Sequence, residues 1–128
     1  MAEMSDYLEV KLLNLTLNGT AFTAVNDPYV SLHTADPTDA GTGAEVTGGS
    51  YARTAASFST ATVGVVATDA DVTFPTATAT WGVVGWIGLW DAASSGNMLY
   101  HTALDATKTI DSGDIFKITT GNLTVELA

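Results

Sequence analysis

Short segments rich in Val, Ile, Thr and aromatic residues recur beyond Asp27-Pro28, separated by clusters of Gly, Asn, Asp and Ser. Segments of this composition are typical of strands, and the clusters between them are typical of turns. About eight short strands at such spacing indicate a sandwich or a barrel. The expected strands are residues 29–34, 51–58, 63–67, 71–74, 84–91, 98–104, 115–118 and 123–127. We therefore predict an all-β fold, a compact antiparallel β-sandwich or jelly-roll-like barrel.

The N-terminal segment has a different pattern. Ser5 is a suitable helix N-cap and Gly19 a suitable stop, so a short helix is predicted between them. The residues that would share one face of this helix are Tyr7, Val10, Leu13 and Leu17. Every second residue from 13 to 17 is leucine, which also permits an extended arm. We predict that residues 1–20 form an N-terminal helix or interaction arm and that residues 21–128 form a single β-sandwich domain.

The longest apolar run covers residues 81–90. A membrane-spanning helix needs about 20 such residues, so this run predicts one central strand or a buried strand pair. On a strand, Trp86, Gly88 and Trp90 would share one face, and Ile87 and Leu89 the other. Burial on both faces is the favoured interpretation of these tryptophans. A surface that binds sugars or a partner is the alternative.

Charge and cysteine content exclude several classes of function. The net charge is −10, and the only cations among the side chains other than histidine are Lys11, Arg53, Lys108 and Lys117. Nucleic-acid binding requires clustered cations, and an acidic surface is repelled by anionic membranes. We therefore expect neither nucleic acid nor a membrane as a partner. The sequence has no cysteine, which excludes disulfides and thiolate metal sites.

The residues that could carry chemistry do not form a recognisable motif. His33 and His101 each fall in a predicted strand, and the chain has no Gly-x-Ser-x-Gly elbow. Acids occur in pairs in segments 69–71 and 111–114, but neither fits the twelve-residue calcium loop. Aspartates in such places are typical of turns, and no acid pair stands out as a glycosidase pair. We predict that the protein is not an enzyme and has no cofactor or metal site.

Residues 29–53 contain a strand, a long polar loop rich in Gly and Thr, and a second strand. A small β-domain with so much polar loop and so little chemistry is typical of a protein that contacts other proteins. The glycines would let the loop conform to a partner, at an entropic cost. Our candidate partner-contact residues are Asp36, Thr38, Thr42 and Glu45 in the loop, together with the N-terminal residues Tyr7, Val10, Leu13 and Leu17.

Several segments carry a resemblance to a known family. They are residues 4–8, 12–14, 29–38, 41–43, 45–46, 48–53, 72–82, 90–92, 96–97, 112–114 and 121–125. Together they resemble a family of small virion proteins of tailed phages and prophages. Its members are usually labelled tail-fibre or minor structural proteins, and some relatives act as capsid cement, or decoration, proteins. The resemblance covers nearly the whole chain and is most specific at residues 31–53 and 72–82.

This resemblance implies a virion structural protein without catalytic residues. We expect a capsid cement protein that binds the outer shell and fastens neighbouring capsid subunits non-covalently, because the chain is short and lacks the repeats of a fibre shaft. The alternative is a small tail-fibre or baseplate component, with glycan binding as a further option. The partner would be the major capsid protein in the first case and tail proteins in the second. We expect a homo-oligomer that is made in the bacterial host cytoplasm and lies on the particle surface.

Overall fold

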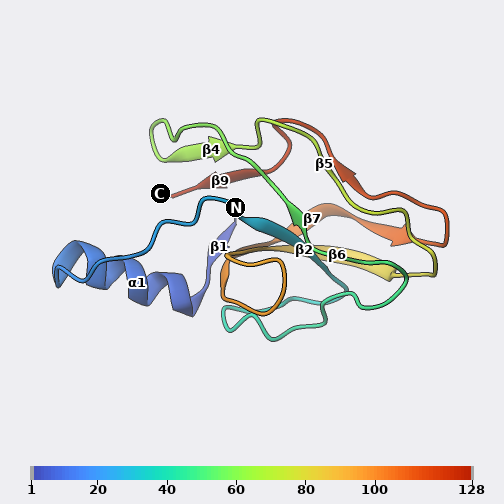
Figure 1. The fold of residues 1–128 in the computed structure, drawn as a ribbon, viewed down its shortest axis with the longest axis horizontal. Coiled ribbons are helices and arrows are strands. Elements are labelled where there is room, and N and C mark those ends of the chain that lie inside the picture. Colours follow the sequence, from blue (N-terminus) through green and yellow to red (C-terminus); the bar gives the residue numbers. More distant parts are fainter. Residues whose placement is uncertain (1, 128) are drawn as a thin grey trace.

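The computed structural model describes residues 2–127 and shows a small all-β fold with one short helix in this range, which confirms the predicted fold class (Figure 1). The elements are β1 (Glu3–Met4), α1 (Asp6–Leu17), β2 (Tyr29–His33), β3 (Thr54–Ala55), β4 (Val65–Ala67), β5 (Val72–Thr73), β6 (Gly82–Trp90), β7 (Met98–Ile110), β8 (Lys117–Ile118) and β9 (Thr124–Glu126).

The larger layer is a five-stranded sheet with the order β1-β7-β6-β2-β3. Its neighbouring strands pair antiparallel. The predicted central strand is confirmed, because β6 lies between β7 and β2. In this register Leu89 lies opposite Val30, and Gly88 lies opposite both Ser31 and His101. Residues directly opposite each other share a face, so the sheet has an aliphatic face and a face that carries polar side chains.

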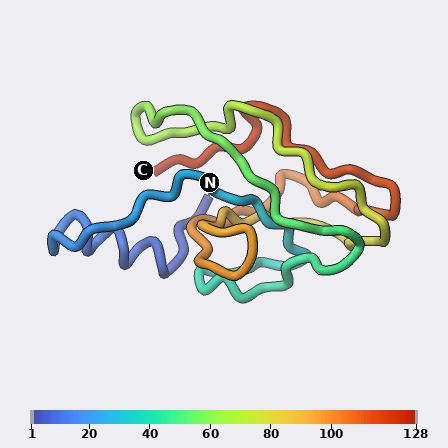
Figure 2. Tube along the Cα trace, in the orientation of Figure 1, coloured from blue at the N-terminus to red at the C-terminus, as the bar shows by residue number. Residues whose placement is uncertain are grey.

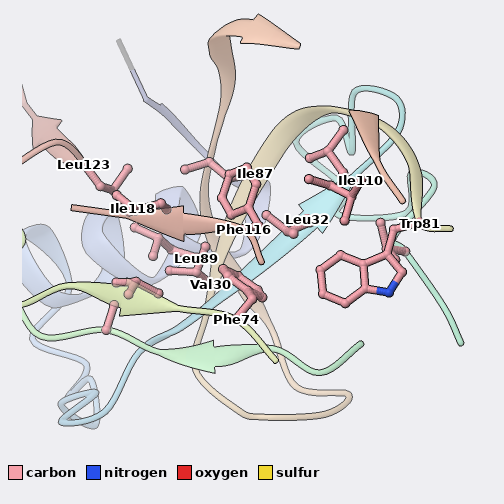
Figure 3. Close-up of a cluster of buried hydrophobic side chains, with 14 of the residues drawn as sticks. Val30, Leu32, Phe74, Trp81, Ile87, Leu89, Ile110, Phe116, Ile118 and Leu123 are labelled. Atoms are coloured by element: carbon pink, nitrogen blue, oxygen red, sulfur yellow. The ribbon is translucent and has the colours of Figure 1, made fainter. Parts of the chain in front are cut away.

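The second layer consists of two separate two-stranded ribbons, β4-β9 and β5-β8. The main core lies between these ribbons and the aliphatic face of the large sheet (Figure 3). Its labelled side chains come from both layers and are Val30, Leu32, Phe74, Trp81, Ile87, Leu89, Ile110, Phe116, Ile118 and Leu123. Phe74 and Phe116 meet edge to face with their ring centroids 5.6 Å apart. The molecule is thus a sandwich of two unequal layers.

Each predicted strand segment beyond Asp27-Pro28 overlaps one observed strand, β2 to β9. Most of them are shorter than predicted, because the residues at their ends do not pair in a ladder. β7 is longer, extending to Ile110 instead of ending at residue 104. The ladder between β6 and β7 is irregular here, because Val84 pairs with Lys108 whereas Trp86 pairs with Ala103. β1 was not predicted, and it pairs through only Glu3 and Met4.

The N-terminal helix forms as its capping residues predict. Ser5 accepts a hydrogen bond from the backbone N–H of Leu8 at 3.2 Å, and Asn18 is the C-cap. Gly19 follows with φ +64°, a left-handed conformation in which glycine has no Cβ penalty. The chain then turns back and runs beside the helix to β2 (Figure 2). The extended arm, which was the alternative to a helix, is not adopted.

Candidate interaction surfaces

The polar face of the large sheet is covered by residues 34–45, which we call the cover loop. Beneath it, the indole Nε1 of Trp90 donates to Ser31 Oγ at 2.7 Å. Ser31 Oγ lies 2.7 Å from Nε2 of His33, whose Nδ1 lies 2.5 Å from the Gly43 carbonyl. One direction satisfies all three bonds: Ser31 donates to Nε2, and Nδ1 donates to the carbonyl.

This hydrogen-bonded chain is structural in character. Ser31 and His33 are both fully buried, so a substrate has no access to the pair. Burial lowers the pKa of His33, against the raising effect of the bond to Gly43, and so favours the neutral imidazole. The pair holds the cover loop on the sheet.

A second polar cluster lies at the C-terminal end of the cover loop. Glu45 accepts from Nε and Nη2 of Arg53, each at 2.8 Å, and from the Tyr51 hydroxyl at 2.8 Å. The guanidinium carbon of Arg53 lies 3.7 Å from the ring centroid of Trp90. Burial alone would raise the pKa of Glu45, but the bonds from Arg53 and Tyr51 outweigh it and lower that pKa. The carboxylate of Glu45 is therefore engaged within the molecule.

The remaining loop candidates lie on an ordered turn. Asp36, Thr38 and Thr42 are exposed. Asp36 accepts from the Thr38 N–H at 2.8 Å, and the Thr42 N–H donates to the Pro37 carbonyl at 3.0 Å. Their contact with a partner stays a prediction. The internal bonds mean that the cover loop offers a shaped surface instead of the adaptable one expected from its glycines.

The tryptophans are mostly buried, as the favoured interpretation of the apolar run predicted. Trp81 is 4% exposed and Trp90 is 8% exposed, whereas Trp86 is half-buried. Trp81 packs edge to face against Tyr51 with centroids 5.4 Å apart, and its Nε1 donates to the Gly49 carbonyl at 2.9 Å. Trp86 lies beside His101 with centroids 6.2 Å apart.

The contacts that attach helix α1 to the sheet, among residues 2–127, lie near its first turn. The Ser5 hydroxyl donates to the Met98 carbonyl at 2.5 Å, and the Ser5 N–H donates to the Leu99 carbonyl at 2.9 Å. Leu8 is the buried residue of the helix. Beyond this turn the helix projects away from the two layers (Figure 1).

The projecting part of α1 carries an apolar row that we call the helix row: Val10, Leu13 and Leu17. These side chains are 57%, 57% and 76% exposed. Their three- and four-residue spacing places them on one helical face, as predicted. The fourth predicted residue, Tyr7, is half-buried, with Lys11 Nζ 5.4 Å from its ring centroid. Tyr7 also lines a groove of about 600 Å³ between the helix and residues 21–27.

One group of side chains could hold a metal ion. One ligand atom from each of Glu3, Asp39 and His101 lies within 4.8 Å of the other two. This group was not predicted, and no metal site was expected, because its members come from β1, the cover loop and β7 and no short motif joins them. The register of β1 against β7, which pairs Glu3 with His101, is the signal that brings the first and last together.

The acid pairs considered for calcium binding form hydrogen bonds within turns, or hydrogen bonds and an ion pair with other segments. Asp114 accepts from the Asp111 N–H at 2.8 Å within their turn. Asp71 accepts from the Thr120 N–H at 2.8 Å and forms an ion pair with Lys117 at 3.0 Å. The bond from Thr120 and then the one from Lys117 lower the pKa of Asp71 to about 2. Asp69 accepts from the Ser57 hydroxyl.

Comparison with known proteins shows the family of this chain. The family model described as "Podophage GP4 fiber I protein gp80" matches residues 3–126. No curated protein matches the chain. In the described part of the chain, the helix falls short of the length and apolar character that a membrane span requires.

Proposed function

Because the chain belongs to the podophage GP4 fiber I protein gp80 family, we propose that it is a structural component of the tail fibre of a podophage. The observation that carries the proposal is the extent of the match, which includes the helix and both layers of the sandwich. The family name favours the tail fibre over the capsid cement role that we expected first. Its partners would then be tail proteins, not the major capsid protein.

The shape of the molecule supports a role in assembly. A two-layered body carries a projecting helix whose apolar row faces solvent. Burying one Val or Leu side chain fully contributes about 1.5–3 kcal/mol, so covering three side chains would stabilise a contact substantially. We propose that the helix row is buried against a neighbouring protein in the fibre, either a second copy of this chain or another tail protein.

Copy number and position in purified particles test the tail-fibre assignment. We expect quantitative mass spectrometry to give a small number of copies, and cryo-electron microscopy of intact particles to place the density at the tail. Hundreds of copies over the head shell would instead support capsid cement and overturn the tail assignment.

Substitution of the helix row tests the contact surface. We expect a triple variant, Val10→Gln, Leu13→Gln and Leu17→Gln, to fold normally but to be lost from particles when it complements a phage that lacks the gene. The reason is that polar side chains at these positions cannot be buried without a hydrogen-bond partner. Particle content is measured by immunoblot, and folding by circular dichroism.

A matched control replaces three exposed apolar residues elsewhere. Val63, Val83 and Ile115 are 96%, 49% and 55% exposed and lie outside the helix. The triple glutamine variant at these positions should enter particles normally. Equal incorporation of both triple variants would contradict the proposed contact. Substitution is a sharper test than removal of residues 1–20, because β1, Ser5 and Leu8 belong to the folded body.

A further inference from the structure

A buried imidazole meets three carboxylates at the edge of the large sheet. His101 Nε2 lies 2.8 Å from Asp39 Oδ1 and 3.7 Å from Glu3 Oε2. The side chain of His101 is 1% exposed, whereas those of Glu3 and Asp39 are 67% and 52% exposed. The nitrogen therefore points from the protein interior toward an open pair of carboxylates.

The other ring nitrogen gives a second, independent indication. Nδ1 of His101 is buried and has no hydrogen-bond partner among the described residues. It faces Asp36 Oδ1 at 3.5 Å. Histidines that bind metals usually direct the opposite ring N–H at a carboxylate, which fixes the tautomer and orients the ring. Here Asp36 lies on the Nδ1 side of the His101 ring, and Glu3 and Asp39 lie on its Nε2 side.

Positive charge is scarce around this cluster. Arg53 pairs with Glu45, and Lys117 pairs with Asp71. Lys11 lies over the ring of Tyr7. Among the described residues, the basic side chain within 4 Å of the carboxylates of Glu3, Asp36 and Asp39 is that of His101. A divalent cation between Glu3 and Asp39 would offset the negative charges of these two exposed carboxylates.

We propose that His101 Nε2, Asp39 and Glu3 bind a divalent transition-metal ion of the zinc class. An imidazole nitrogen with two carboxylates suits such an ion, whereas magnesium and calcium prefer oxygen ligands alone. Metal–ligand distances of about 2.0–2.2 Å separate the donors of a tetrahedral ion by about 3.4 Å. When the ion binds, the 2.8 Å distance from His101 Nε2 to Asp39 Oδ1 must therefore increase slightly. The 3.7 Å distance from Nε2 to Glu3 Oε2 must decrease slightly. The fourth position faces solvent between the exposed carboxylates.

A metal here would fasten three segments together. Glu3 belongs to β1, Asp39 to the cover loop and His101 to β7. The Asp39 carbonyl also accepts from the Asp6 N–H at 3.1 Å, at the first residue of α1. The ion would thus stabilise the base of the projecting helix. This inference does not depend on the tail-fibre assignment.

Titration of untagged, chelator-treated protein tests the site. We expect calorimetry with Zn²⁺ to show saturable binding of one ion per chain, and Co²⁺ to give the strong visible absorption of a four-coordinate ion. The variants Glu3→Gln and Asp39→Asn should each weaken Zn²⁺ binding about tenfold or more and remove the Co²⁺ bands. Asp105→Asn removes an exposed charge from β7 and should leave both unchanged.

Asp36→Asn separates a true site from a general acidic attraction. The asparagine keeps an oxygen that can accept from the Thr38 N–H, but it replaces the carboxylate that faces Nδ1 by a neutral amide. The affinity for Zn²⁺ should therefore fall about tenfold. His101 itself is left intact because it is buried in the fold. Non-saturable binding, or equal affinity in Glu3→Gln, Asp39→Asn and Asp105→Asn, would overturn the proposal.

Discussion

Gly88 lies where polar side chains from neighbouring strands converge beneath the cover loop. A Cβ atom at this position would lie 2.8 Å from Ser31 Oγ and 2.9 Å from Trp90 Nε1. These two atoms form the first hydrogen bond of the chain that ends at Gly43. The missing side chain is therefore what lets the Trp90 indole reach Ser31.

Replacement of Gly88 by alanine should break this arrangement. We expect Gly88→Ala to lower the free energy of unfolding by about 1–3 kcal/mol, because overpacking a filled site forces its neighbours to move. The control is Gly85→Ala in the same strand, where a Cβ would meet only Thr107 Cγ2 at 3.4 Å, an ordinary contact. Urea denaturation measures both, and equal stability of the two variants would contradict the packing argument.

Individual residues could be predicted only in part. The two-residue period of a strand correctly separated Trp86, Gly88 and Trp90 from Ile87 and Leu89. It could not reveal that Asp39 meets His101, because that contact depends on how the cover loop folds back over the sheet. Contacts of this kind depend on tertiary structure and cannot be predicted from local composition.

Helix α1 depends on a side chain that acts on both the helix and the sheet. The Ser5 hydroxyl accepts from the Leu8 N–H and donates to the Met98 carbonyl, and Ser5 is 1% exposed. Capping fixes where the helix begins, and the bond to Met98 fixes where it is attached. This explains why the predicted helix exists although most of its length is not packed.

Removal of this hydroxyl should loosen the helix. We expect Ser5→Ala to destabilise the protein by about 1–2 kcal/mol, because it leaves a buried N–H and a buried carbonyl without this partner. Amide hydrogen exchange of residues 6–17 should accelerate. Thr16→Ala is the matched control, since its hydroxyl bonds the Leu12 carbonyl on the exposed part of the same helix. Unchanged exchange in Ser5→Ala would show that the attachment lies elsewhere.

The elements differ in how well sequence predicts them. Capping residues and turn clusters placed α1 and β2 to β9 within a few residues, except for the C-terminal end of β7. β1 was missed because two residues carry no periodicity, and its pairing with β7 joins positions about a hundred residues apart. β7 was predicted too short because its last residues are largely exposed and polar, which resembles a loop.

At the scale of the whole molecule, charge makes stability depend on pH. Burial lowers the pKa of His33 in the folded state, so the unfolded chain binds its proton first as pH falls. Stability is then lost from about pH 6.5 downward, the ordinary value for histidine. Glu45 and Asp71 have lowered pKa values, so their contribution is present above about pH 4 and disappears as pH falls through those lowered values.

Acid denaturation of the whole protein should therefore proceed in two stages. We expect the free energy of unfolding, measured by urea denaturation, to fall between pH 7.5 and 5.5 with a slope of at most about 1.4 kcal/mol per pH unit from His33. It should fall again below about pH 5. The variant His33→Gln should be less stable at pH 7.5. Its free energy of unfolding should lack the contribution of His33 to the fall between pH 7.5 and 5.5, and should still fall below about pH 5. The variant Glu45→Gln should keep the loss of stability between pH 7.5 and 5.5 and should reduce only the loss below about pH 5. A wild-type free energy of unfolding that is constant from pH 7.5 to 5.5 would contradict a neutral, buried His33 in the folded state.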